Sequence, residues 1–121
     1  MAIDFTFSPE VEHARRMIRG FLNSEVKPAF AELQQREDVS RDDWSRLVKE
    51  LRTKARETGY WLPHMPQEIG GMGLSVTAVA AVSAEAAKVP MAPYIINCQA
   101  PDEGNMHTLY HFATEYQRKH Y

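Results

Sequence analysis

Cysteine is almost absent from this sequence, since Cys98 is the only one. A single cysteine excludes a disulfide within the chain and is typical of proteins in a reducing cytoplasm. Long hydrophobic runs are also missing: no apolar stretch approaches the ~20 residues that a membrane-spanning helix needs. The N-terminus lacks the pattern of a signal peptide. We therefore expect a cytoplasmic protein without a membrane partner.

An excess of one charge is lacking as well. The chain has 14 Lys and Arg residues against 16 Asp and Glu, a net charge of −2. This balance gives no electrostatic basis for nucleic acid as a partner. Eleven of the 14 basic residues precede Gly59, so the first half is the solvated, mixed-charge half. A length of 121 residues supports one domain, residues 1–121, around a single core.

The first half of the chain has the pattern of two amphipathic helices. Residues 8–10, Ser-Pro-Glu, form a helix start with a hydroxyl cap, a proline at the first position and an acid in the first turn. Apolar residues then recur at helical spacing. Pro28 should kink or interrupt this helix, because proline lacks an amide donor and crowds the preceding turn. Ser40 begins a second helix, and Gly59 is a natural end for it.

The second half predicts a loop followed by further helices. Residues 60–74 contain two prolines and three glycines, which favours a loop. A serine-capped, alanine-rich helix at 75–87 should be the buried central helix, because alanine lets helix axes approach closely. Shorter helices are expected at 94–99 and 103–113, and a capping box at 114–117 starts a sixth. With no convincing strand, the prediction is all-α, an orthogonal or up-and-down bundle of about six helices.

The polar link at residues 97–106, Asn-Cys-Gln-Ala-Pro-Asp-Glu-Gly-Asn-Met, is the first candidate site. It lies between two apolar helical patterns, and loops held by rigid helices commonly carry ligand contacts. The alternative is helix-end chemistry, in which Asp102 satisfies free amides at the start of a helix. Cys98 has no basic neighbour that would depress its pKa, so we expect a small buried hydrophobe rather than a nucleophile.

A glycine-rich segment at residues 66–75, Pro-Gln-Glu-Ile-Gly-Gly-Met-Gly-Leu-Ser, is the second candidate. Glycines can mark backbone approach to phosphate, but a dinucleotide site needs G-x-G-x-x-G between a strand and a helix. Neither the spacing nor the context fits here. A tight structural loop, in which glycines adopt positive φ, explains the pattern better.

Both segments resemble signatures of acyl-CoA dehydrogenases, in the same order and at similar spacing. Residues 66–75 are similar to the family's P-x-E-x-G-G-x-G-L-S run, and residues 97–106 resemble an N-C-x-A-P-D-x-G-N-M run of one subgroup. The resemblance covers the whole chain and implies the family's N-terminal helical domain. It implies that four residues line the far end of an acyl-chain pocket: Tyr94, Asn97, Cys98 and Met106. It implies a structural role for the loop residues Glu68, Gly70, Gly71 and Gly73.

The family's chemistry depends on segments that no part of this sequence matches. By the resemblance, FAD binds through a following β-domain and a C-terminal helical bundle, both expected to be absent here. A glutamate, usually in the C-terminal part, removes the α-proton of an acyl-CoA while hydride passes to the flavin, which gives an enoyl-CoA. We therefore assign no catalytic residue and no cofactor to this chain. FAD and acyl-CoA are expected only in the longer parent, and the isolated chain is expected to be inactive.

A second hypothesis comes from aromatic residues near the C-terminus. They are Tyr110, Phe112, Tyr116 and Tyr121. Tyrosine is enriched at protein interfaces. These residues therefore favour a helical scaffold, natural or engineered, that self-associates as a homodimer. The alternative is natural drift of a surface.

A third hypothesis is a metal-binding helical module. His107 and His111 stand four residues apart on one helical face, as two metal ligands would. The zinc-protease motif is missing, because no glutamate follows the first histidine. Two exposed histidines are far commoner than a metal site, so no metal is assigned.

Overall fold

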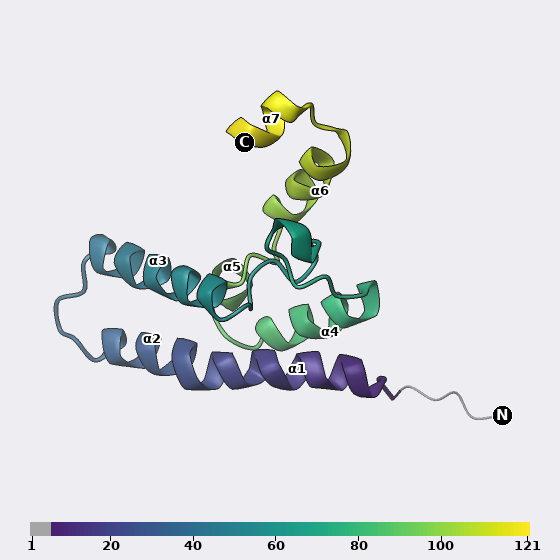
Figure 1. Ribbon diagram of the computed structural model, residues 1–121. Coiled ribbons are helices and arrows are strands. Elements are labelled where there is room, and N and C mark those ends of the chain that lie inside the picture. Colours follow the sequence, from purple (N-terminus) through teal and green to yellow (C-terminus); the bar gives the residue numbers. More distant parts are fainter. Residues whose placement is uncertain (1–5) are drawn as a thin grey trace.

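Helices account for the regular structure of this chain. The computed structural model describes residues 6–121 and contains no strand within that range (Figure 1). The elements in chain order are α1 (Pro9–Phe21), a π-helical turn (Leu22–Val26), α2 (Lys27–Gln34), α3 (Arg41–Glu57), a 3-10 turn (Gln67–Ile69), α4 (Val76–Ala86), α5 (Ala92–Ile95), α6 (Asp102–Phe112) and α7 (Glu115–His120). The all-α prediction is confirmed.

Side-chain caps explain where four of these helices begin. The hydroxyls of Ser8 and Ser75 each accept a hydrogen bond from the amide three residues on, both at 3.3 Å. Ser40 and Thr114 each form a capping box, in which the side chain three residues on also accepts from the amide of the cap. Losing such a cap costs a helix ~0.5–2 kcal/mol. Because caps act over three residues, the sequence predicted all four starts.

Pro28 interrupts the first helix as predicted, and the interruption takes the form of a π-turn. The amide of Lys27 donates to the carbonyl of Leu22, five residues back. This wider turn lets Pro28 fall in the first turn of α2, a position where its missing amide is tolerated. α1 and α2 consequently run on as one long rod (Figure 1).

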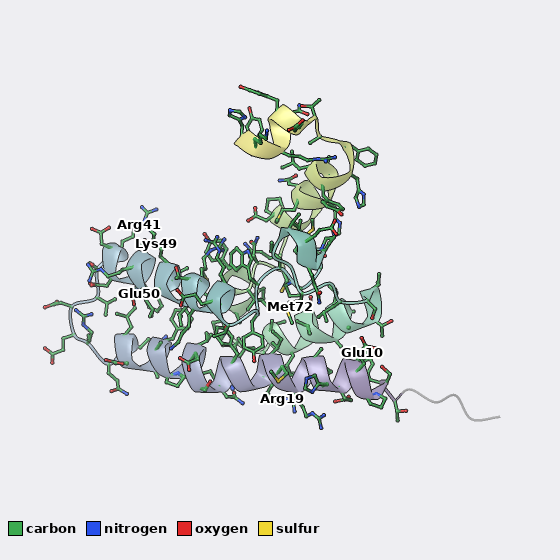
Figure 2. All side chains as sticks on the ribbon, viewed as in Figure 1. Glu10, Arg19, Arg41, Lys49, Glu50 and Met72 are labelled. Atoms are coloured by element: carbon green, nitrogen blue, oxygen red, sulfur yellow. The ribbon has the colours of Figure 1, made fainter. Side chains whose placement is uncertain are left out.

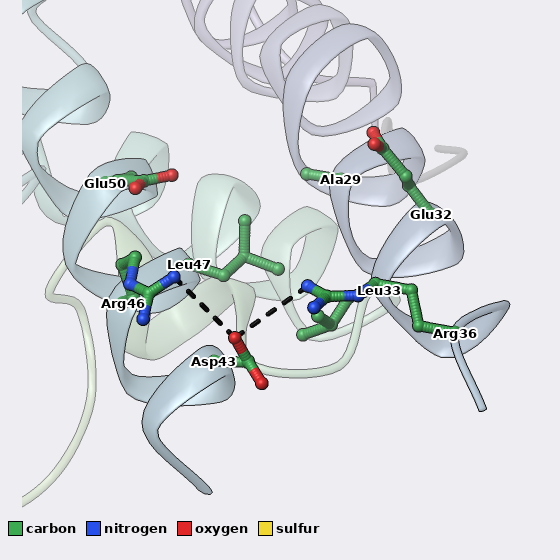
Figure 3. A pocket seen from close by; sticks show the side chains of 8 residues that line it. All are labelled: Ala29, Glu32, Leu33, Arg36, Asp43, Arg46, Leu47 and Glu50. Atoms are coloured by element: carbon green, nitrogen blue, oxygen red, sulfur yellow. Dashed lines mark ion pairs between the residues drawn. The ribbon is translucent and has the colours of Figure 1, made fainter. Parts of the chain in front are cut away.

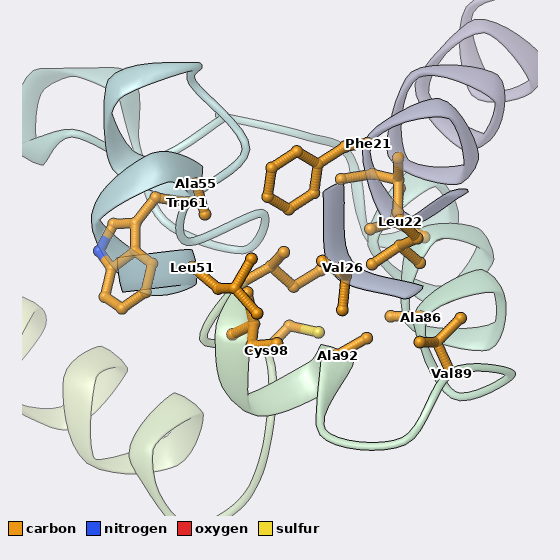
Figure 4. Packing of buried hydrophobic residues seen from close by; sticks show 14 of the residues in the cluster. Phe21, Leu22, Val26, Leu51, Ala55, Trp61, Ala86, Val89, Ala92 and Cys98 are labelled. Atoms are coloured by element: carbon orange, nitrogen blue, oxygen red, sulfur yellow. The ribbon is translucent and has the colours of Figure 1, made fainter. Parts of the chain in front are cut away.

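The hydrophobic core lies where this rod meets α3, α4 and α5 (Figure 4). α1 packs along α4, and α3 packs against both α2 and α5. Ile18, Leu22 and Val26 from the rod are almost fully buried, as are Ile95 and Ile96 at the end of α5. Burying a side chain of this size stabilises a fold by ~1.5–3 kcal/mol. The core therefore ties residues from both halves of the chain into one domain.

α4 is buried on one face only, which corrects the expectation of a buried central helix. Ala78, Ala81, Val82 and Ala86 are at most 5% exposed, whereas Val76 is 87% exposed. Alanine does allow the close approach of α4 to α1. An alanine-rich run gives no information, however, on how many faces of the helix are covered.

α5 is shorter and begins earlier than the helix predicted at 94–99. Met91 precedes it in the left-handed region, with φ of 63°, and Pro93 lies in its first turn. The helix ends before Asn97, which has a φ of 55°, because a right-handed helix cannot continue through that conformation. Both ends depend on positive φ at non-glycine residues, and a sequence pattern does not reveal these.

α6 and α7 form an arm that extends away from the body of the domain (Figure 1). Neither helix contains a buried residue. Met106 and Tyr110 on α6 are partly buried and pack against the core cluster. These contacts attach the first helix of the arm to the body.

Charged side chains project from the remaining surface, as Lys49 and Glu50 on α3 show (Figure 2). Where α2 faces α3, Asp43 lies 3.8 Å from Arg36 and 3.7 Å from Arg46 (Figure 3). Exposed pairs of this kind contribute little to stability. Among residues 6–121, no helix has the length and apolar character needed to cross a membrane.

Candidate functional site

The glycine-rich loop and the turn after α5 lie side by side. The amide of Leu62 donates to the carbonyl of Ile96 at 3.0 Å, and the amide of Met72 donates to the carbonyl of Leu62, also at 3.0 Å. Leu62 itself has a positive φ of 53° and is 4% exposed. The two motifs singled out in the sequence are separated by α4 and α5. They are nevertheless held close together by Leu62, which bonds to Met72 in the first motif and to Ile96 just before the second.

At each glycine of the loop, the local geometry explains why glycine is present. Gly70 and Gly73 have φ of 87° and 63°, which glycine adopts without strain. At Gly71 there is no room for a side chain, because a Cβ there would lie 2.1 Å from the carbonyl oxygen of Met65. The carboxylate of Glu68 accepts a hydrogen bond from the hydroxyl of Tyr110. The loop thus supports α6, whose first turns carry the end of the 97–106 segment.

Asn97 and Met106 are two candidate wall residues that touch each other. Asn97 is 5% exposed, and its Nδ2 donates to the Met106 sulfur at 3.5 Å. Asparagine tolerates the left-handed conformation found here better than most residues. Its Oδ1 is buried with no hydrogen-bond partner in the described chain, and an unsatisfied group of this kind costs ~1–3 kcal/mol. The contact joins the turn after α5 to α6 and leaves one polar acceptor unused.

Cys98 lies in the core (Figure 4). It is 6% exposed and shares a hydrophobic cluster with Leu51 and Ala92. Burial raises the pKa of its thiol to about 11, and a hydrogen bond with Ser83 partly opposes this shift. The thiol is therefore protonated at neutral pH, and a protonated thiol is a poor nucleophile.

Tyr94, the fourth candidate, is held by α3. The guanidinium of Arg52 lies 4.2 Å from the centroid of the Tyr94 ring and 4.6 Å from that of Trp61. Its Nη1 also donates to the carbonyl of Tyr94 at 2.6 Å. Tyr94 therefore ties α5 to α3, whereas Asn97 ties it to α6. The sequence did not point to Arg52, since an arginine on a helix gives no sign of the rings that it will contact.

Comparison with known proteins assigns this arrangement of loop, turn and helices to a family. The sequence profile of the acyl-CoA dehydrogenase N-terminal domain matches residues 8–121. The chain belongs to the acyl-CoA dehydrogenase family. The resemblance inferred from the two motifs is thereby confirmed.

Relatives within the acyl-CoA dehydrogenase family are much longer than this chain. Acyl-CoA dehydrogenase family member 10 of Mus musculus is 34% identical over 118 residues, which span 92% of this chain and 11% of that protein. FadE2 of Mycobacterium tuberculosis, an acyl-CoA dehydrogenase-type protein, is 30% identical across 96% of this chain and 29% of its own length. The solved structure of an acyl-CoA dehydrogenase-type protein from Mycobacterium abscessus has a TM-score of 0.75 at 28% identity, over 95% of this chain and 31% of that one. The chain thus spans less than a third of these relatives.

His64 is a residue of this acyl-CoA dehydrogenase-type domain to which no sequence motif pointed. Both of its ring nitrogens are buried without a hydrogen-bond partner in the described chain. Its ring centroid lies 5.2 Å from that of His107, which stacks in turn on His111 at 6.1 Å. Burial lowers the pKa of His64, Glu103 opposes that shift, and His107 adds to it. Among residues 6–121, no group of three His, Cys, Asp or Glu side chains is placed to hold a metal ion.

The four aromatic residues considered for an interface divide into two sets. Tyr110 is engaged within the domain, because its hydroxyl donates to Glu68 and its ring packs against the core. Phe112, Tyr116 and Tyr121 are 84%, 67% and 86% exposed. The exposed three, rather than Tyr110, are available for contact with another molecule.

Proposed function

We propose that this domain forms one wall of the acyl-chain pocket in a longer, flavin-dependent acyl-CoA dehydrogenase. The contact between Asn97 and Met106 supports the proposal, because it brings an amide with an unused acceptor and a thioether together where α5 leads into α6. A thioether side chain is unbranched and polarizable, so it adapts to an alkyl chain. Ligand pockets typically combine such apolar surface with a few polar groups.

The glycine-rich loop does not fit the pyrophosphate of FAD, so we assign FAD binding to other parts of the longer protein. A bound pyrophosphate needs free amides from a glycine-rich turn or a helix start. In the glycine loop these amides are already used: Gly70, Gly71 and Gly73 donate to carbonyls within residues 65–67 at 2.8–3.0 Å. The domain by itself is therefore expected to lack dehydrogenase activity.

The role proposed for this wall is to bind and orient the acyl chain. Relatives across the matched region are named as acyl-CoA dehydrogenases, which supports oxidation of an acyl-CoA to an enoyl-CoA as the reaction of the longer protein. The one thiol of the turn, that of Cys98, is buried with a raised pKa, so we assign it no role as a nucleophile or base.

A domain exchange tests this proposal. The 121 residues replace the matching segment of the Mycobacterium abscessus homologue, and kcat/KM is measured with acyl-CoAs of increasing chain length. Met106→Trp should fill the end of the pocket and lower kcat/KM for the longest chains by roughly tenfold, a change of about 1.4 kcal/mol. The shortest chains should be unaffected. Phe112→Trp, on the exposed arm, is the matched control. The proposal would be contradicted by an active exchange protein in which Met106→Trp leaves the dependence of kcat/KM on acyl-chain length unchanged.

We also propose that the exposed arm mediates contact between two copies of the chain. Phe112, Tyr116 and Tyr121 expose large rings on an arm without buried residues, and exposed aromatic surface favours association. α7 has Glu115 in its first turn and Arg118 in its last turn. An antiparallel pair of α7 helices would therefore place opposite charges together.

Sedimentation velocity tests this second proposal. The wild-type chain should sediment as a dimer at micromolar concentration, and the Phe112→Asp, Tyr116→Asp double variant as a monomer with an unchanged helical circular dichroism spectrum. Wild-type protein that stays monomeric at high micromolar concentration would reject it. An engineered origin and a metal site at His107 and His111 remain untested hypotheses from the sequence.

A further inference from the structure

Two adjoining cavities form a groove bounded by α2, α3 and α5. The first, of about 300 Å³, includes Lys27 and Phe30 in its lining, and the second, of about 630 Å³, includes Lys49 and Arg52. Trp44 and Met91 line both, so the cavities meet at these two side chains. Sites for small organic ligands have volumes of roughly 300–1,000 Å³. These six residues define what we call the Trp44 groove.

The floor of the Trp44 groove is apolar. The rings of Phe30 and Trp44 pack at 5.5 Å between centroids. Met91 is 46% exposed, and its backbone is held in the left-handed region. Exposed apolar surface of this kind favours the burial of a hydrocarbon against it.

The charges around the groove are all positive and lack a carboxylate partner among the described residues. Three of the five lysines in the sequence pair with an acid within the chain. The other two, Lys27 and Lys49, both line the groove. Arg52 contacts aromatic rings and a carbonyl instead of an acid. No acid lines either cavity, although the chain has 16 acids and a net charge of −2.

We propose that the Trp44 groove binds a single-chain anionic amphiphile, a free long-chain carboxylate. Its alkyl chain lies along Phe30, Trp44 and Met91, and its carboxylate lies beside Lys49 and Arg52, the two cations that line one cavity together. A neutral lipid would leave these cations unused, and an inorganic anion would leave the apolar floor uncovered.

This site lies apart from the contact between Asn97 and Met106, on which the proposed acyl-pocket wall rests. Asn97 and Met106 line neither cavity, whereas Tyr94, another candidate for the wall, lines the second. The groove proposal therefore does not depend on the function proposed for that wall, and either one can fail while the other holds.

Calorimetric titration of the 121-residue chain with dodecanoate, below its micelle-forming concentration, tests the groove. We expect saturable binding of one dodecanoate per chain. Lys49→Gln should weaken it roughly two- to fivefold, the range for loss of one charge contact at an exposed site. Lys119→Gln, a lysine paired with Glu115 on the exposed α7, is the matched control and should change nothing. Met91→Gln should also weaken binding, with circular dichroism confirming an unchanged fold.

Dodecyltrimethylammonium, which has the same chain length and the opposite charge, separates charge recognition from nonspecific hydrophobic binding. We expect it to bind at least roughly tenfold more weakly than dodecanoate. Equal binding of the two amphiphiles would overturn the proposal, as would dodecanoate affinity that Lys49→Gln leaves unchanged. The absence of saturable dodecanoate binding would also overturn the proposal. This outcome includes the case in which the chain associates only with anionic phospholipid vesicles.

Discussion

Arg19 and Glu85 form a two-point ion pair that joins α1 to α4. Nε and Nη2 of Arg19 lie 2.7 and 3.0 Å from the two carboxylate oxygens of Glu85. Glu85 is 5% exposed, and Lys88 and Arg15 lie 3.1 and 3.5 Å from one of the same oxygens. The hydrogen bonds from Arg19 are the main reason that the pKa of Glu85 falls to about 2 despite its burial. A buried charge is thus satisfied at the helix contact beside the core.

Glu85→Gln should lower the free energy of unfolding by ~1–3 kcal/mol, because it removes a buried negative charge that faces three cations and replaces one of its two acceptor oxygens with a donor. Urea denaturation measures the change. Glu115→Gln breaks the exposed pair with Lys119 on α7 and should have no measurable effect. Equal effects of the two substitutions would show that the Glu85 pair contributes no more to stability than an exposed pair.

Acid should weaken the fold through the same carboxylate. Folding depresses the pKa of Glu85 from its ordinary 4.5 to about 2, so the unfolded chain takes up the proton first. The contribution of Glu85 is therefore fully present above pH 4.5 and is lost as the pH falls toward 2. Across that range the difference in unfolding free energy between wild type and Glu85→Gln should shrink. A constant difference would contradict the assignment.

Gly71→Ala and Gly104→Ala should change stability in opposite directions. A Cβ at Gly71 would lie 2.1 Å from the carbonyl oxygen of Met65, so the loop must shift, at a cost of ~1–3 kcal/mol. A Cβ at Gly104 meets nothing within 4 Å, and alanine within a helix such as α6 stabilises by ~0.5–1 kcal/mol over glycine. Thermal unfolding of both variants decides this. Stabilisation or no change in the Gly71→Ala variant would refute the loop geometry.

His64 should make the fold sensitive to mild acid. Burial holds its pKa below the ordinary value of 6.5, with Glu103 opposing and His107 adding to the shift. Because protonation then favours the unfolded chain, the contribution of His64 is present above pH 6.5 and is lost as the pH falls below it. Urea midpoints on both sides of that pH should differ for wild type and differ less for His64→Gln. His13→Gln, at an exposed position, should behave as wild type.

Local sequence signals predicted the order of the helices and many of their starts. Ser8, Ser40, Ser75 and Thr114 were informative because a cap bonds to an amide only three residues away. The ends of α5 could not be predicted, because they depend on the backbone conformation of Asn97 and the residues before the helix. Propensity and spacing carry no information on such conformations.

The contacts among the candidate site residues could not be predicted from the sequence. Asn97 and Met106 belong to one segment that the sequence singled out, yet their contact depends on how the turn after α5 bends. His64 meets His107 across the fold, and Glu85 meets Arg19 across 66 residues. Pairs of this kind have no periodic or compositional signature in a single sequence.

Photo-crosslinking tests the acyl-pocket wall most directly. An acyl-CoA with a diazirine at the end of its chain is irradiated in the active exchange protein, and the labelled peptides are identified by mass spectrometry. A wall formed by Asn97 and Met106 predicts label within residues 94–106, with Met106 as the main site. Label found only in the segments contributed by the Mycobacterium abscessus homologue, with none in residues 94–106, would contradict it.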